Sequence, residues 1–305
     1  KREWLDKAHT CLLLSLAIQD ISTAVCLLVI PNFLLSSDVY KFPSHPTHRR
    51  LYCSIIWSQY IPFSLSIVSI YTCLMLAIDR WLAVLRPMSY RRYCSSKKLI
   101  ATMLILPWIA GFGFEIGSAL NVKDLQLRNG SYGCILSEYH SSPKNTVTVL
   151  FLILGKGFLP AILMVIAYAQ MIIKLMKTSS RVSREAALSG IPNSIFSNTR
   201  HNERHCSLQR ITKMVCAASA LVMICWLPDQ LYFGIFELGL TKRDLSFENQ
   251  LHVLAFLNTC LNPFVYGFSN GQYQEEFKKM LCCFFKQQAR PQVNSTNDLE
   301  ERDPQ

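Results

Sequence analysis

Charged and amide side chains interrupt several long apolar stretches of this sequence. Asp20 ends the run LSLAIQD, Asp79 and Arg80 interrupt CLMLAIDRWLAVL, and Asn258 and Asn262 lie four residues apart in the last run. A charge in the middle of a membrane costs about 2.5 to 3.5 kcal/mol, so each one needs a partner or a function. These residues are therefore candidates for an ion site, a switch, or both.

One such group could bind a cation. Asp20, Ser69, Asn258 and Asn262 could meet in the centre of a helical bundle, where carboxylate, hydroxyl and amide oxygens suit a small hard cation such as sodium. The alternative is a water-filled polar seam without a bound ion. The sequence thus predicts an allosteric sodium site and requires no other cofactor.

The elements that must position these residues are membrane helices. The chain has 305 residues, and six apolar stretches approach or exceed the roughly 20 residues that cross a bilayer: 11–34, 55–85, 99–120, 147–175, 211–238 and 251–268. Helices buried in a large soluble core are the alternative, which the length of these stretches disfavours. We therefore expect an all-α fold, with a transmembrane bundle over residues 1–268.

Lys and Arg are concentrated in alternate connections, which indicates the cytoplasmic side. By this criterion both ends of the chain are cytoplasmic. Cys53 and Cys134 lie at the outer ends, where an oxidising compartment would preserve a disulfide. Asn129, in the sequon Asn-Gly-Ser, is a predicted glycosylation site in the same outer loop.

The motifs and their order resemble the class A, rhodopsin-like G-protein-coupled receptors, and most closely the branch that binds peptides. The resemblance covers residues 14–283 and is carried by LxxAxxD ending at Asp20, DRW at 79–81, Trp108, Pro160 with Tyr168, CWLP at 225–228 and NPFVY at 262–266. The family has seven helices, and the resemblance implies that this chain lacks the first. It also implies a multi-pass protein of the plasma membrane.

The resemblance assigns roles in signalling to several residues. Arg80 would pair with Asp79 at rest and swing toward the G protein on activation, while Trp226 would act as the switch beneath the ligand pocket. The complete set of implied coupling and switch residues is Asp79, Arg80, Tyr168, Trp226, Pro228, Asn262, Pro263 and Tyr266. The family pattern places the outer cysteine at Ile55, two residues after Cys53.

The predicted pocket contains residues of both charges and suits a peptide better than a lipid. Pro62 occupies the position where amine receptors carry an aspartate, and the last helix lacks the lysine that binds retinal in opsins. The candidate ligand-binding residues are Glu115, Lys156, Asp229, Gln230, Phe233 and His252. Lys156 could instead pair with Asp229 or Glu115 only to reduce the cost of burial.

Residues after the last apolar stretch predict contacts with the inner membrane surface. Residues 269–286 have the pattern of an amphipathic helix lying on the membrane, and Cys282 and Cys283 at its end are candidate palmitoylation sites or, alternatively, two buried thiols. Residues 287–305 are predicted to form a disordered cytoplasmic tail. The third inner loop is predicted at about 178–207.

The function predicted from these observations is a receptor that promotes nucleotide exchange on a heterotrimeric G protein. Its expected partners are that G protein, an extracellular peptide and membrane lipids, with arrestin as a further candidate and no nucleic acid. The sequence has no phosphate-binding loop or nucleophile elbow, so we do not expect an enzyme. Two alternatives stay open: a six-span transporter or channel, and a truncated, non-signalling receptor variant.

Overall fold

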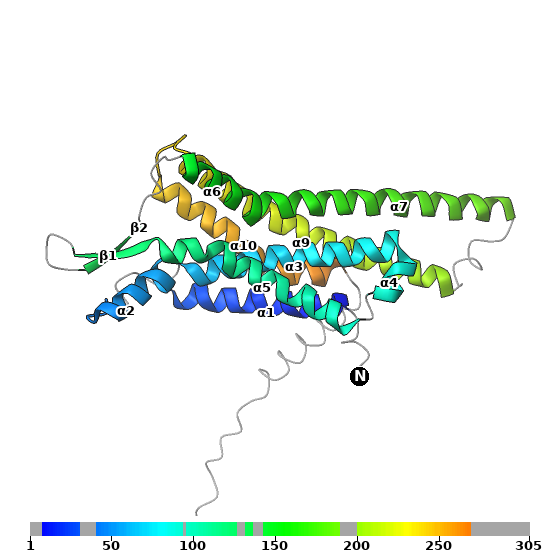
Figure 1. The fold of residues 1–305 in the computed structure, drawn as a ribbon. Coiled ribbons are helices and arrows are strands. Elements are labelled where there is room, and N and C mark those ends of the chain that lie inside the picture. Colours follow the sequence, from blue (N-terminus) through cyan, green and yellow to red (C-terminus); the bar gives the residue numbers. More distant parts are fainter. Residues whose placement is uncertain are drawn as a thin grey trace, which may run out of the picture.

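The computed structural model describes residues 8–30, 41–93, 96–126, 132–136, 143–189 and 200–269. Long helices run along a common axis, with α2 and a hairpin at one end and α4 at the other (Figure 1). The helices are α1 (Ala8–Val29), α2 (Pro46–Leu51), the π-helix η2 (Tyr52–Trp57), α3 (Tyr60–Leu85), α4 (Pro87–Tyr93), α5 (Lys97–Leu120), α6 (Pro143–Ile153), the π-helix η3 (Leu154–Phe158), α7 (Leu159–Ser189), α9 (Arg200–Glu237) and α10 (Leu245–Ser269). The strands β1 (Val122–Gln126) and β2 (Tyr132–Leu136) form the antiparallel hairpin, with Val122 opposite Leu136.

The prediction of an all-α transmembrane bundle is confirmed. Within the described ranges, five helical segments are long and apolar enough to cross a membrane: Ala8–Val29, Pro46–Leu85, Lys97–Leu120, Thr146–Thr178 and Ile211–Glu237. The sixth predicted span, 251–268, falls within α10, which has 25 residues. Large apolar side chains such as Ile21, Ile109 and Val165 are more than half exposed, as expected where a helix faces lipid.

The predicted span 55–85 is not one continuous α-helix. The π-helix η2 precedes α3, and the two are separated at Gln59, whose φ of 56° and ψ of 28° are left-handed. Residues other than glycine rarely adopt this conformation, so it marks a true break in the helix. The sequence pattern could not reveal the break, because the apolar run continues through it.

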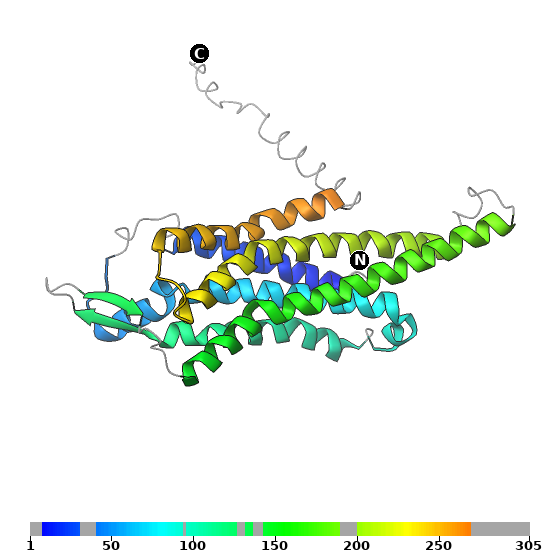
Figure 2. The ribbon, with the colours of Figure 1, turned by 90° about the horizontal axis from the view of Figure 1, so that it is seen from above.

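The inner ends of α7 and α9 differ from the sequence prediction. Helix α7 continues to Ser189 and α9 begins at Arg200, so most of the loop predicted at 178–207 is helical. Figure 2 shows α7 extending past the other helices at this end. The prediction was wrong because a polar composition does not distinguish a loop from the solvated end of a long helix.

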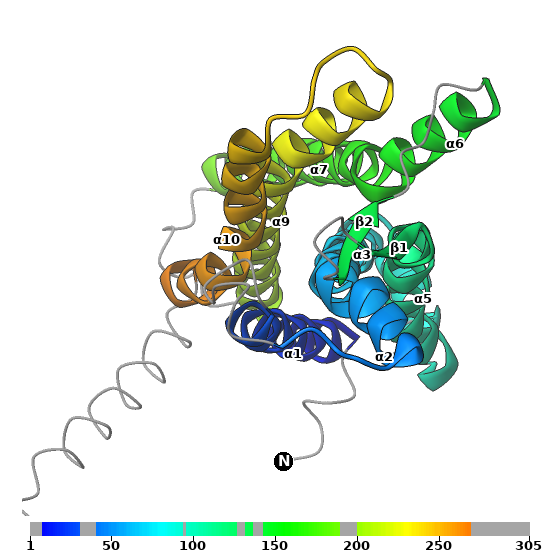
Figure 3. The ribbon, with the colours of Figure 1, turned by 90° about the vertical axis from the view of Figure 1, so that its left-hand side faces the viewer.

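Helix α3 is the centre of the bundle, and it contacts α1, α5, α7 and α9 (Figure 3). Its closest neighbour is α5, because Gly111 leaves room for the backbone of α3. A Cβ atom at Gly111 would lie 2.6 Å from the Ser64 carbonyl oxygen and closer still to Val68 Cγ2. Glycine is therefore needed where α3 and α5 cross. This crossing fixes the position of α3, which extends from the outer to the inner end of the bundle.

Some predictions fall outside the described residues. These include nearly all of the amphipathic helix at 269–286, the tail at 287–305, the glycosylation site Asn129, and the palmitoylation sites Cys282 and Cys283. They stay predictions from the sequence alone.

Candidate functional site

A cavity of about 500 Å³ opens at the outer end of the bundle, between α3, α5, α9, α10 and η3. All six candidate ligand-binding residues line it: Glu115, Lys156, Asp229, Gln230, Phe233 and His252. They come from four separate segments of the sequence, and the fold brings them together around one space. A volume of this size falls in the range of small-ligand sites or of an anchoring part of a larger ligand.

The first ion pair of the cavity is buried. The Lys156 Nζ atom lies 2.6 Å from Glu115 Oε1, and the two side chains are 6% and 5% exposed. The other carboxylate oxygen of Glu115 accepts a hydrogen bond from the Ser118 hydroxyl at 2.6 Å. Lys156 also lies 5.2 Å from the centre of the Phe233 ring. Of the two predicted partners of Lys156, the structure thus selects Glu115.

The second ion pair lies at the cavity rim and is more exposed. Arg243 donates to both carboxylate oxygens of Glu248, from Nε at 2.7 Å and from Nη2 at 2.8 Å. This hydrogen-bonded pairing raises the pKa of Arg243 above its ordinary value, so the guanidinium remains charged. Nearby, the Tyr232 hydroxyl accepts from the backbone N–H of Asp244 at 2.9 Å and holds the start of α10.

The third carboxylate of the cavity, that of Asp229, is not paired with a Lys or Arg side chain among the described residues. Asp229 accepts from Gln230 Nε2 at 3.1 Å, and its Oδ1 atom lies 3.4 Å from His252 Nε2. Histidine offers a full charge only when protonated. In the part of the chain that the structure describes, no Lys or Arg lies within ion-pair distance of Asp229. That part of the cavity therefore carries one carboxylate without a permanent cationic partner.

Aromatic residues form the floor of the cavity. The Phe63 ring lies 4.9 Å from His252 and 6.2 Å from Trp226, measured between ring centroids. Trp226 is 1% exposed and donates its indole N–H to the carbonyl of Lys156 at 3.2 Å. Pro228 lies within α9, two residues after Trp226. The floor thus connects the cavity to the residue that the family resemblance assigns as a switch.

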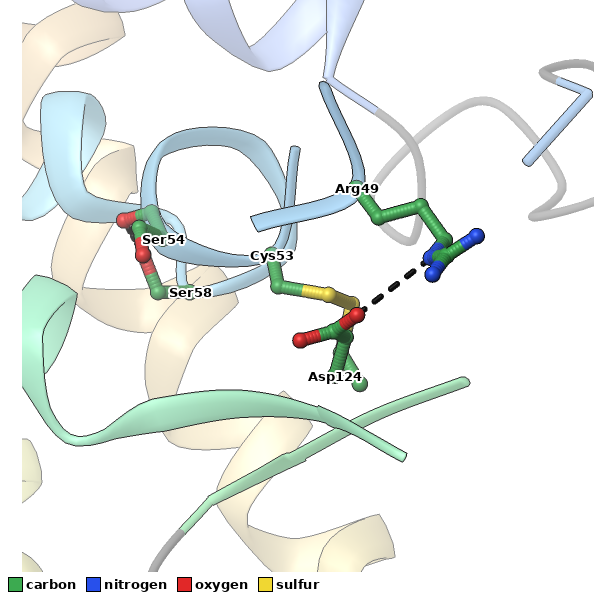
Figure 4. Close-up of a disulfide and its surroundings, with 6 residues drawn as sticks. Arg49, Cys53, Ser54, Ser58 and Asp124 are labelled. Atoms are coloured by element: carbon green, nitrogen blue, oxygen red, sulfur yellow. Dashed lines mark hydrogen bonds and ion pairs between the residues drawn. A yellow bond between two sulfur atoms is a disulfide. The ribbon is translucent and has the colours of Figure 1, made fainter. Parts of the chain in front are cut away.

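The outer end is held by the predicted disulfide, which joins Cys53 of η2 to Cys134 of β2 (Figure 4). Arg49 supports the same contact, because its Nε lies 3.3 Å from Asp124 of β1 and its guanidinium lies over the Tyr132 ring. The π-helix and the break at Gln59 separate Cys53 from the regular part of α3. Cys53 can therefore reach the hairpin despite its two-residue displacement from the family position.

A polar layer lies deeper in the bundle, below Trp226. Asn262 donates from Nδ2 to Asp20 Oδ2 at 3.0 Å, while Asp20 Oδ1 and Asn262 Oδ1 are buried without a hydrogen-bond partner among the described residues. Ser69 donates to Gln19 Oε1 at 3.3 Å, which leaves the lone pairs of its oxygen free. Asn258 directs its oxygen to Thr259 instead. Among the described residues, Asp20 Oδ1, Ser69 Oγ and Asn262 Oδ1 thus accept no hydrogen bond, whereas the Asn258 oxygen accepts one from Thr259.

The inner end of α3 contains the charged pair of the DRW motif. Arg80 donates to Asp79 and also to the Tyr90 hydroxyl at 3.2 Å, and both members of the pair are almost fully buried. The neighbouring Trp81 donates its indole N–H to Gln170 of α7 at 2.6 Å. This pairing of Arg80 with Asp79 is the arrangement that the resemblance assigns to the resting receptor.

The remaining predicted switch residues lie on α7 and α10. The Tyr168 hydroxyl hydrogen-bonds to the Ser219 hydroxyl at 2.8 Å and donates to the Val215 carbonyl at 3.2 Å, which joins α7 to α9. Pro263 and Tyr266 belong to α10, but their side chains lie outside the described part of the structure.

Sequence reasoning missed several residues of these sites. Gln19 is fully buried and donates to Ser15 and Thr72 besides accepting from Ser69. Its position inside an apolar span beside Asp20 was a usable signal. Ser118, which donates to Glu115, and Tyr71, whose hydroxyl donates to the Gly155 carbonyl, also belong to these networks. Nothing in their local sequence marks them, because their partners lie on another turn or another helix.

Comparison with known proteins agrees with the family resemblance seen in the sequence motifs. The family described as "7 transmembrane receptor (rhodopsin family)" matches residues 2–266. Galanin receptor 2a of Danio rerio is 24% identical over 302 residues, which cover 96% of this chain and 74% of that protein. The allatostatin-A receptor of Bombyx mori is 24% identical over 276 residues (88% and 70%), and neuropeptide Y receptor type 6 of Oryctolagus cuniculus is 26% identical over 281 residues (87% and 69%).

Proposed function

This chain belongs to the rhodopsin family of seven-transmembrane receptors, and from that premise we propose that it is the receptor of an extracellular peptide whose cationic group binds Asp229. Its relatives include receptors named for galanin, allatostatin-A and neuropeptide Y. As a member of the family it is a multi-pass protein of the plasma membrane that couples to a G protein. The match over residues 2–266 favours this function over that of a six-span transporter or channel.

The charge balance of the cavity carries the proposal. Glu115 and Glu248 are each paired with a permanent cation, whereas the partners of Asp229 within the described ranges are Gln230 and His252. A buried carboxylate without a cation is costly, and a basic side chain or amino terminus of a peptide would compensate it. Glu237, at the end of α9, lines a smaller neighbouring cavity of about 80 Å³ instead. Asp229 is therefore the favoured anchor point.

The test is a screen of synthetic neuropeptides on the full-length receptor, read by recruitment of engineered G proteins. Asp229→Asn is then compared with the unchanged receptor. Removal of one partner of a buried charge pair costs about 2 to 5 kcal/mol, so potency should fall at least about 30-fold. Asp124→Asn, which opens an ion pair outside the cavity, is the matched control and should leave potency unchanged.

Two results would contradict the proposal. If Asp229→Asn leaves the potency of every active peptide unchanged, Asp229 is not the anchor. If the receptor responds to lipids or amines and to no peptide, the ligand class is wrong.

We also propose that Asp20 binds a sodium ion as an allosteric cofactor, together with Asn262 and Ser69. Support comes from the buried oxygens Asp20 Oδ1 and Asn262 Oδ1, which lack a hydrogen-bond donor within the described part of the chain. The Ser69 hydroxyl donates a hydrogen bond to Gln19 Oε1, so its oxygen lone pairs can still coordinate a cation. Such an oxygen-rich group suits a hard cation, whereas the orientation of Asn258 argues against its participation in this state.

A further inference from the structure

The π-helix η3 and Pro160 leave two buried carbonyl groups without their α-helical donors. The backbone N–H of Leu159 donates to Leu154, so it is not used by the carbonyl of Gly155 as in an α-helix. In an α-helix the carbonyl of Lys156 would require the N–H of residue 160, which is proline and has none. Buried carbonyls need hydrogen-bond donors, and other elements can supply them.

Side chains from two other helices supply these donors. The Tyr71 hydroxyl of α3 donates to the Gly155 carbonyl at 2.8 Å, and the Trp226 indole of α9 donates to the Lys156 carbonyl at 3.2 Å. Helix α5 packs closely against η3 here, since a Cβ atom at Gly155 would lie 2.5 Å from Phe114 Cζ of α5. The π-helix η3 is therefore a joint at which α3, α5 and α9 meet.

Lys156 contributes to this joint with both its backbone and its side chain. Its carbonyl holds the indole of Trp226, while its ammonium group lies in the cavity wall and pairs with Glu115 of α5. Both Lys156 and Glu115 are buried, so the pair is poorly screened by solvent. A change of charge in the cavity can thus reach Trp226 through a single residue.

We propose that the Glu115–Lys156 ion pair holds Trp226 in its resting position, which makes Lys156 a positioning residue between the ligand cavity and the switch on α9. The proposal rests on the receptor function given above. A cationic ligand group bound at Asp229 repels the Lys156 ammonium group across the same cavity, which loosens its pair with Glu115 and weakens the hydrogen bond to Trp226. The resting and active arrangements then differ in the hydrogen bond between Trp226 and the Lys156 carbonyl, and ligand binding shifts the balance between the two arrangements.

The test measures signalling without any ligand. The variant Glu115→Leu with Lys156→Met removes both charges of the pair, so neither is left without its partner, and this type of exchange often preserves stability. Recruitment of engineered G proteins to the full-length receptor, at equal surface amount, should rise about fivefold, the shift expected from loss of one hydrogen bond. The exchanged pair Glu115→Lys with Lys156→Glu should return recruitment to within about twofold of the unchanged receptor.

The control is Asp124→Asn, which opens the Arg49–Asp124 pair outside the cavity and should not alter ligand-free recruitment. The variant Trp226→Phe, which removes the indole N–H, tests whether the ion pair acts through the hydrogen bond between Lys156 and Trp226. If Lys156 acts through Trp226, loss of the ion pair adds nothing in the Trp226→Phe background. Additive effects, or unchanged recruitment when the pair is lost, overturn the proposal.

The result can be separated from that of the proposed function, because no peptide is used. If the apolar variant does not reach the cell surface, Glu115→Gln is read in the same way and with the same expected rise. A rise in ligand-free recruitment together with no response to any peptide contradicts only the peptide proposal. Unchanged recruitment together with a peptide response that depends on Asp229 contradicts only the role of Lys156.

Discussion

The outer cavity and the deeper polar layer handle buried charge in different ways. In the cavity, Glu115 and Glu248 are each paired with a cationic side chain. In the polar layer, Asp20 is hydrogen-bonded to the amide of Asn262, and its second oxygen has no partner among the residues that the structure describes. Each region nevertheless contains one carboxylate that no described Lys or Arg neutralises, Asp229 in the cavity and Asp20 in the layer.

This contrast indicates which cation could compensate each carboxylate. Asp229 lines a cavity of about 500 Å³ that a peptide side chain can enter. Asp20 is 6% exposed and is not among the residues that line this cavity, so a peptide side chain would not reach it. A carboxylate without a cationic side chain thus predicts a ligand contact in the cavity and an ion site in the polar layer. Four sets of variants test this difference between the regions, and their expected effects decrease in turn.

The greatest loss of stability is expected at the α3–α5 crossing, because both regions depend on the position of α3. Gly111→Leu forces side-chain atoms against the α3 backbone, so it should cost about 3 kcal/mol or more and strongly reduce the amount of receptor at the cell surface. Gly113→Leu is the matched control, because a Cβ atom there meets nothing within 4 Å. Equal surface amounts for the two variants would show that the α3–α5 crossing is not critical.

The second prediction separates the two carboxylates. Sodium chloride, compared with choline chloride, should raise the Tm of the purified receptor by several degrees, as expected for about 1 to 3 kcal/mol of binding. Asp20→Asn should abolish this difference, whereas Asp229→Asn should retain it. If both variants retain it, Asp20 does not bind sodium; if both lose it, the two regions are not independent.

The third prediction concerns the hydrogen bonds that surround Asp20. Gln19→Leu removes the partner of Ser15, Ser69 and Thr72 in a fully buried position, so it should cost about 1 to 3 kcal/mol and lower the Tm. Gln170→Leu removes an exposed hydrogen bond to Trp81 and should have a smaller effect. Peptide potency should be unchanged in Gln19→Leu if the polar layer is separate from the cavity, and a loss of potency would contradict that separation.

The weakest effect is expected at the rim of the cavity. The side chains of Arg243 and Glu248 are 39% and 18% exposed, and exposed pairs contribute only about 0.2 to 1 kcal/mol. Glu248→Gln should therefore change peptide potency by less than about fivefold, measured as a concentration-response curve. An effect as large as that of Asp229→Asn would place a ligand contact at the rim instead.

Much of the fold could be predicted from local sequence features. The apolar stretches predicted the long helices, and the polar residues inside them identified Asp20, Asp79, Arg80 and Asn262 as candidates. All six candidate ligand-binding residues line one cavity. The break at Gln59 and the π-helices could not be predicted, since they depend on packing rather than on composition. The extensions of α7 and α9 were missed because a polar composition does not distinguish a loop from the solvated end of a helix.

The order of residues along the chain is enough to say which side chains carry charge within the membrane, because length, hydropathy and the positions of Lys and Arg are local properties. It is also enough to say that Lys156 cannot have an α-helical donor at its carbonyl, since residue 160 is proline. The groups that compensate these features follow from the packing of the bundle alone. Lys156 pairs with Glu115 rather than Asp229, and Trp226 satisfies the carbonyl, because contacts between helices distant in sequence depend on how their faces meet.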